Sequence, residues 1–175
     1  MITIKVPMSV NGIKELQKKI TKIKKLSPKM QQRFITKSLR YIKKKANEHL
    51  KENYSAYSWY ERTGRLEHDW EIVATEFSGT LRNLAPYSAF VEYGTGLVGK
   101  HPMADVHNYQ YNVNDHQYGW LFYFENESHF TQGLEGYWFV YQAVYNDYLM
   151  TGMARKLFNE AFEEVIGRAI KWFSI

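Results

Sequence analysis

Four histidines gather in one half of the chain and, by residue type, could bind a transition metal. Zinc sites use such ligands, but at short and regular spacings that this segment lacks. Solvated loop histidines explain the pattern better, so the sequence predicts no metal site. A small hydrolase that uses His101 and His107 is the weakest alternative function. The histidines and the aspartates near them are His101, Asp105, His107, Asp115, His116 and His129.

Acidic residues near the middle of the chain could pair for general acid–base catalysis. Glu61, Glu67, Asp69 and Glu71 are the candidates. Such catalysis needs a pocket that shifts their pKa values, and the alternation of the last three is typical of the solvent-facing side of a strand. The sequence therefore predicts no catalytic carboxylate.

A glycine pattern, Gly94-x-Gly96-x-x-Gly99, fits the dinucleotide-binding fingerprint. That fingerprint needs a helix after it, whose N-terminus meets the pyrophosphate. Polar loop residues follow here instead, and no serine lies in a G-x-S-x-G elbow. We predict no cofactor and no enzymatic activity.

Charge is divided unequally along the chain. Residues 1–51 hold fifteen Lys and Arg against two Glu, whereas residues 52–175 hold eight against sixteen Asp and Glu, within a total of +5. Lysines on a helix can neutralise DNA phosphates without reading sequence, or can face an acidic protein. A solvated helix face explains them equally well. The candidate contact residues are Lys18, Lys22, Lys25, Lys29, Arg33 and Lys37.

Length and composition favour one domain over residues 1–175. The chain has no cysteine, which excludes disulfides and thiolate sites. We find no signal-peptide pattern and no segment that approaches a membrane span, so we expect the chain to start in a cytoplasm without a membrane partner. Aromatic residues make up 17% of the chain and suit half-buried sheets and interfaces.

Residues 1–52 are predicted to be a basic helical segment after a short edge strand over Met1–Pro7. Asn11 is expected to cap a first helix, and Ser27-Pro28 to end it and start a second. The second helix is predicted to run to about Glu52. Its apolar stripe is Ile35, Leu39, Ile42, Ala46 and Leu50.

Residues 53–96 are predicted to hold a loop, a strand pair and a turn. The strands are His68–Phe77 and Thr80–Leu84, joined by a turn at Ser78-Gly79. Pro86–Tyr93 follows as a short helical turn, which Gly94-Thr95-Gly96 ends.

Residues 97–150 are predicted to form a long loop (97–117) and an aromatic hairpin, and residues 151–175 a helix. The hairpin strands are Tyr118–Phe124 and Tyr137–Tyr145, linked by Glu125–Gly136. The predicted fold is α+β: an antiparallel sheet of about four strands packed against the long N-terminal-half helix and the C-terminal helix. That last helix follows Gly152 to about Trp172, with the stripe Met153, Leu157, Ala161, Val165, Ala169 and Trp172.

Three segments resemble the head–tail joining (tail completion, minor capsid) proteins of tailed bacteriophages. The middle one is similar to that family's PYAxYVEFGTG turn, and order and spacing agree over roughly residues 30–170. The family's usual Arg-Pro-Phe is replaced by Arg155-Lys156-Leu157. The segments are Thr63-Gly64-Arg65-Leu66, Pro86-Tyr87-Ser88-Ala89-Phe90-Val91-Glu92-Tyr93-Gly94-Thr95-Gly96 and Thr151-Gly152-Met153-Ala154-Arg155-Lys156-Leu157-Phe158.

The resemblance implies a structural protein of the virion neck, assembled in the bacterial host cytoplasm. It implies a ring-forming, often hexameric subunit between the portal–adaptor complex and the tail. Its partners would be copies of itself, connector or adaptor and tail proteins, and transiting double-stranded DNA. The motif residues would shape the fold rather than bind a ligand. The alternative, from another class, is a non-specific nucleic-acid-binding protein that uses residues 14–45.

Overall fold

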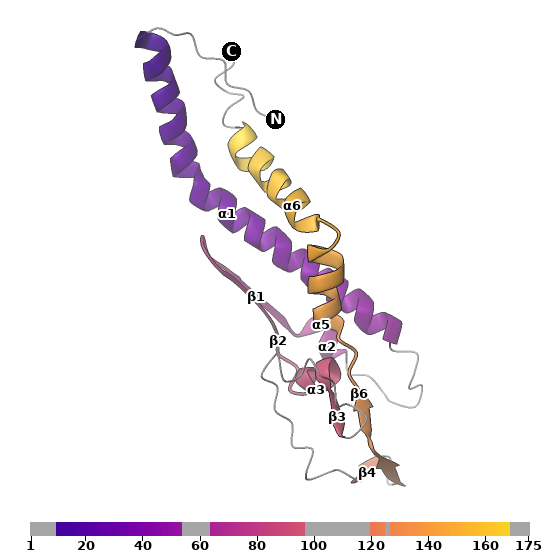
Figure 1. Ribbon diagram of the computed structural model, residues 1–175. Coiled ribbons are helices and arrows are strands. Elements are labelled where there is room, and N and C mark those ends of the chain that lie inside the picture. Colours follow the sequence, from indigo (N-terminus) through magenta and orange to yellow (C-terminus); the bar gives the residue numbers. More distant parts are fainter. Residues whose placement is uncertain (1–9, 54–63, 97–119, 125–126, 169–175) are drawn as a thin grey trace. The chain divides into compact units, whose positions relative to one another are not determined.

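The computed structural model describes residues 10–53, 64–96, 120–124 and 127–168 (Figure 1). It combines helices and strands, as predicted. Contacts divide the chain into two compact units. Unit 1 consists of residues 1–41, 72–81 and 148–175, and unit 2 of residues 42–71 and 82–147. The predicted strand at Met1–Pro7, the loop over 97–117 and the end of the last helix lie outside the described residues.

The long basic segment forms one helix, α1 (Val10–Asn53), so the predicted break at Ser27-Pro28 is wrong. A proline inside a helix removes one hydrogen bond and costs about 3 kcal/mol. Apolar side chains on both sides of Pro28 pack in one cluster, which favours a continuous helix. Figure 1 shows a bend in α1, as a proline inside a helix commonly causes. The cluster residues from α1 are Ile23, Leu26, Met30 and Phe34.

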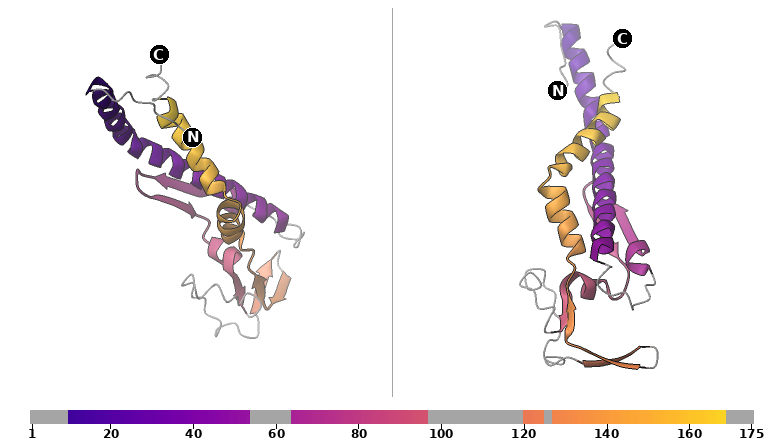
Figure 2. Two further views of the ribbon diagram at one scale, coloured as in Figure 1. Left: turned by 45° about the horizontal axis from the view of Figure 1, so that its top comes forward. Right: turned by 90° about the vertical axis from the view of Figure 1, so that its right-hand side faces the viewer.

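The C-terminal helix supplies the other side of the unit 1 core. Helix α6 (Met153–Phe162) continues into a π-helical segment, η4 (Glu163–Gly167), and runs alongside α1 (Figures 1 and 2). Ala161 and Ile166 are buried against Met30, and the rings of Phe34 and Phe158 meet edge to face at 5.6 Å. Of the predicted stripe, Leu157 and Ala161 are buried and Val165 packs against the core, which confirms this part of it.

The predicted first strand pair is present as β1 (Trp70–Ala74) and β2 (Gly79–Asn83). Thr75 fixes the turn, because its Oγ1 accepts the backbone N–H groups of Phe77 and Ser78. The ring of Phe77 is 81% exposed on this turn. Gly79 lies so close to Ile35 that a Cβ atom there would collide with it.

Unit 2 contains the short helices α2 (Arg65–His68) and α3 (Ser88–Tyr93), and the latter confirms the predicted helical turn. Strand β3 (Gly94–Gly96) pairs with β6 (Gly133–Glu135), and β4 (Trp120–Phe124) pairs with β5 (Glu127–Thr131), both antiparallel. The predicted sheet of about four strands is not confirmed, because the described strands form three separate pairs. The segment predicted as a polar link supplies β5 and β6.

The predicted strand at Tyr137–Tyr145 is wrong, because this segment is helical. It forms α5 (Phe139–Gln142) and then a π-helical segment, η3 (Ala143–Leu149). Its aromatic and β-branched residues favour a strand by composition. However, Phe139 and Ala143, four residues apart, are both fully buried, which is the spacing of a helix face.

Candidate functional site

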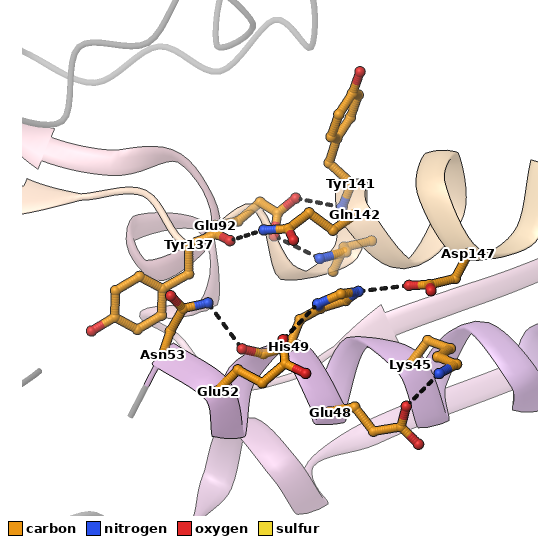
Figure 3. A network of polar contacts seen from close by, with 11 residues as sticks. Lys45, Glu48, His49, Glu52, Asn53, Glu92, Tyr137, Tyr141, Gln142 and Asp147 are labelled. Carbon is orange, nitrogen blue, oxygen red and sulfur yellow. Dashed lines mark hydrogen bonds and ion pairs between the residues drawn. The ribbon is translucent and has the colours of Figure 1, made fainter. Parts of the chain in front are cut away.

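Glu92, in the segment that resembles the phage motif, is a buried carboxylate of unit 2. Its side chain lies in helix α3 and is only 7% exposed. The two carboxylate oxygens accept the backbone N–H groups of Val140 and Tyr141, each at 2.9 Å (Figure 3). These amides belong to the first turn of α5, where a helix has no internal acceptor for them. We call this arrangement the Glu92 cap.

Helix α5 needs such a cap because its own sequence provides none. The residue before it is Trp138, which has a left-handed backbone (φ 53°) and makes no side-chain capping bond. A negative charge at a helix N-terminus is also favoured by the helix dipole. A remote carboxylate, 48 positions from Val140 in the chain, therefore does the work that a local Ser or Asp usually does.

A close backbone contact holds the two segments of the Glu92 cap together. The N–H of Tyr137 donates to the carbonyl of Val91 at 2.8 Å, and that of Trp138 to the carbonyl of Glu92 at 3.1 Å. A Cβ atom at Gly136 would lie 2.6 Å from the Glu92 carbonyl oxygen. Glycine is thus required at position 136 by the close approach of the two backbone segments. Gly94, with φ 84°, turns the chain from α3 into β3.

Aromatic rings continue from the Glu92 cap along α5. Trp138 meets Tyr93 edge to face at 5.4 Å and Tyr141 at 5.9 Å, and Tyr141 stacks on Tyr145 at 5.5 Å. Burial raises the pKa of the Tyr93 hydroxyl above 10.0. These contacts are worth about 0.5–1.5 kcal/mol each beyond burial, so the row supports the geometry of the cap.

The other motif residues also serve local structure. Gly64 begins α2 with φ 71°, Leu66 is buried, and the Nε of Arg65 lies 2.8 Å from a carboxylate oxygen of Asp69. Thr95 and Gly96 lie in β3 opposite β6. Thr63 lies outside the described residues, and so do Gly99, Glu61, His101, His107 and His116.

A histidine that the sequence did not single out lies between two carboxylates in unit 2. The Nε2 of His49 is 2.6 Å from Asp147 Oδ2, and its Nδ1 is 3.3 Å from Glu52 Oε2 (Figure 3). Nearby, the ammonium of Lys45 contacts Glu48 and lowers the pKa of that carboxyl. Asp147 is 98 residues from His49 in the chain, so no local spacing could have indicated the pair.

The candidate DNA-contact residues divide into two groups along α1. Arg33 and Lys37 form ion pairs with the C-terminal helices: Arg33 with Glu164 at 2.8 Å, and Lys37 with Glu164 at 2.6 Å and Glu160 at 3.1 Å. Hydrogen bonds from Lys37 and Arg33 lower the pKa of Glu164 to about 2. The hydrogen bonds of Lys37 to Glu164 and Glu160 raise the pKa of Lys37. Lys18, Lys22, Lys25 and Lys29 lie exposed, closer to the N-terminal end.

The part of the chain that the structure describes also bears on metal binding and on membrane spanning. No three His, Cys, Asp or Glu side chains there are grouped so that they could hold a metal ion. No helix in the described ranges has an apolar stretch long enough to cross a membrane. Each of the acidic residues Glu67, Asp69 and Glu71 lies near a basic side chain, which is Lys51, Arg65 and Arg82 respectively. Glu67 and Asp69 lie in and just after α2, while Glu71 lies in β1, 3.8 Å from Arg82.

Comparison with known protein families, with curated proteins and with solved structures gives no match to this chain.

Proposed function

We propose that this chain is a structural subunit of the neck of a tailed bacteriophage, acting in head–tail joining or tail completion. The observation that carries the proposal is the Pro86–Gly96 segment, whose sequence resembles the family's turn. Both carboxylate oxygens of Glu92 accept hydrogen bonds from backbone amides, which is a structural role for a charged residue. That role suits a protein that works by assembly.

Assembly requires surface that neighbouring subunits can cover. On the β4–β5 pair, Leu121 and Phe130 lie directly opposite each other in register and are 63% and 62% exposed. Opposed residues in an antiparallel pair project from the same face. Contiguous exposed apolar side chains commonly mark interaction sites. The proposal assigns this face to contacts between copies of the chain in a ring, which is often hexameric in the resembling family.

Deletion of the gene from the phage genome that encodes the chain tests the proposal. We expect lysates with separate DNA-filled heads and tails by electron microscopy, and recovery of joined particles when the gene is supplied in trans. Fully infectious tailed particles after deletion would overturn the proposal. Gene neighbours that encode portal and tail proteins would support it.

A pair of substitutions tests the surface assignment. Phe130→Asp places a charge on the apolar face, while Gln132→Asp adds the same charge at an exposed position next to it. We expect the first variant to fail in complementation and the second to succeed. Light scattering after size-exclusion chromatography should show the loss of large oligomers only for Phe130→Asp. Equal complementation by both variants would remove this face from the proposal.

A further inference from the structure

The N-terminal half of α1 carries a row of lysines that we call the basic stripe: Lys14, Lys18, Lys22, Lys25 and Lys29. Their spacings of three or four residues place them within an arc of about 80° at 3.6 residues per turn. The row is about 22 Å long at 1.5 Å per residue. All five side chains are exposed in the structure.

The basic stripe faces away from the apolar side of the same helix. At the same helical periodicity, Leu16, Ile23 and Met30 point to the opposite side from the lysines. Met30 is buried in the unit 1 core, and Ile23 packs against that core. Because the core fixes the rotation of α1, it also fixes the direction in which the basic stripe points.

Two glutamates of the C-terminal helices form ion pairs with a different part of α1. Glu160 and Glu164 pair with Arg33 and Lys37, one or two turns beyond the stripe. Lys14, Lys18, Lys25 and Lys29 form no ion pair with any described residue. Like charges four residues apart destabilise a helix by a few tenths of a kcal/mol per pair. An external polyanion would relieve that repulsion.

We infer that the basic stripe binds double-stranded DNA through its phosphates, without reading sequence. A duplex carries one negative charge per about 1.7 Å of its axis, so a row of about 22 Å faces many phosphates. Over residues 11–32 the arc contains Asn11 and Gln32 besides the cations, and no apolar or aromatic residue. Protein interfaces are depleted in lysine and anchored by apolar or aromatic side chains, so the composition favours DNA over an acidic protein.

This inference goes beyond the proposed function and stands on different residues. A neck subunit need not bind DNA, and a DNA-binding chain need not form a neck. The phage deletion and the Phe130→Asp comparison report on assembly. The binding experiment below reports only on the stripe, so the two ideas fail separately.

Anisotropy of a fluorescein-labelled, mixed-sequence duplex of about 30 base pairs, measured from 50 to 250 mM NaCl, tests the inference. With about four phosphate contacts, we expect the slope of log K against log salt to be about −3 to −4. Affinity should therefore fall roughly 50-fold between 50 and 150 mM. A duplex of different sequence should bind equally well.

Two variants that lose the same charge isolate the stripe. The stripe variant combines Lys14→Gln, Lys18→Gln, Lys25→Gln and Lys29→Gln. The control combines Arg40→Gln, Lys44→Gln, Arg155→Gln and Lys156→Gln, all exposed positions outside the stripe. We expect the stripe variant to flatten the salt slope by about 3 and the control to keep it. Circular dichroism should show equal helix content, since lysine and glutamine have similar helix propensities.

Several results would overturn the inference. Absence of duplex binding by the unmodified chain at 50 mM NaCl is one, and an equal loss of slope in both variants is another. Competition with polyglutamate as effective as with DNA would assign the stripe to acidic proteins. Stripe-dependent binding to phosphatidylserine vesicles without duplex binding would assign it to a lipid surface.

Discussion

Two carboxylates of this chain show two ways to stabilise a charge. In unit 2, Glu92 is buried and bonds to two backbone N–H groups. In unit 1, Glu164 lies at the surface and bonds to the side chains of Arg33 and Lys37. The donors of Glu92 are fixed by the helix itself, whereas those of Glu164 are the ends of long side chains. We therefore expect Glu92 to resist salt and Glu164 to respond to it.

The comparison also separates what each group does for the fold. The Glu92 cap joins segments far apart in the chain and starts a helix that has no local cap. Removing it leaves two part-buried backbone N–H groups without this acceptor, which is costly. The Glu164 ion pairs join helices that already share an apolar core around Met30 and Ala161. Their removal leaves that core intact.

Replacing Glu92 should have the largest effect. Glu92→Ala removes two charge-assisted hydrogen bonds and should lower the free energy of unfolding by about 3 kcal/mol. Glu92→Gln keeps one acceptor oxygen and should cost about 1 kcal/mol. Urea unfolding measures the loss, and hydrogen exchange should accelerate at the amides of Val140 and Tyr141. Glu135→Gln, at an exposed position of unit 2, is the control and should leave both unchanged.

Gly136 should be the next most sensitive position. A Cβ atom there would lie 2.6 Å from the backbone of Glu92 and Tyr93. Gly136→Ala should therefore cost about 1–3 kcal/mol through overpacking. Gly152→Ala is the comparison for backbone strain, because Gly152 has φ 72° and nothing lies within 4 Å of a Cβ atom there. Strain without overpacking should cost about 1 kcal/mol. A smaller loss at Gly136 than at Gly152 would argue against the close approach.

Glu164 should determine part of the acid sensitivity. Its pKa is about 2 in the folded chain, below the ordinary 4.5. The stability from this lowered pKa is thus complete above about pH 4.5 and is lost as the pH falls toward 2. Glu164→Gln should reduce the change of melting temperature with pH between about pH 4.5 and 2, and 1 M NaCl should reduce it in part. Lys37 should have a matching effect at alkaline pH. Because its pKa is raised above the ordinary 10.5, its contribution to stability is complete below about pH 10.5 and is lost as the pH rises through the raised pKa.

The sequence predicted the helices where periodic burial decides the structure. The stripe Ile42, Ala46 and Leu50 is buried on α1, and Leu157 and Ala161 are buried on α6. The prediction at Pro28 failed because a local breaker was outweighed by apolar contacts on both sides of it. These contacts are made with a helix more than one hundred residues away in the chain. The local sequence around Pro28 therefore could not indicate them.

The candidate site shows the same limit. Composition predicted a strand at Tyr137–Tyr145, but the Glu92 cap, set 48 positions earlier, stabilises a helix there. One signal for a helix was available in the sequence, because Phe139 and Ala143 have helical spacing. The start of that helix carried no signal, because no small polar residue precedes it as a cap. Glu92 itself was singled out through the motif, while His49 and Asp147 carried no signal of their own.

Glu160 should show the smallest effect and sharpen the contrast most. Its only ion pair in the described part of the chain is with Lys37 at 3.1 Å, while Lys37 also lies 2.6 Å from Glu164. When Glu160→Gln removes one partner, the ammonium keeps the closer one. We expect a change in unfolding free energy within about 0.5 kcal/mol of zero. A double-mutant cycle with Lys37→Gln should give a coupling energy smaller for Glu160 than for Glu164. Equal couplings would mean that the two glutamates share Lys37 evenly, and the unit 1 carboxylates would then act as a network rather than through one dominant pair.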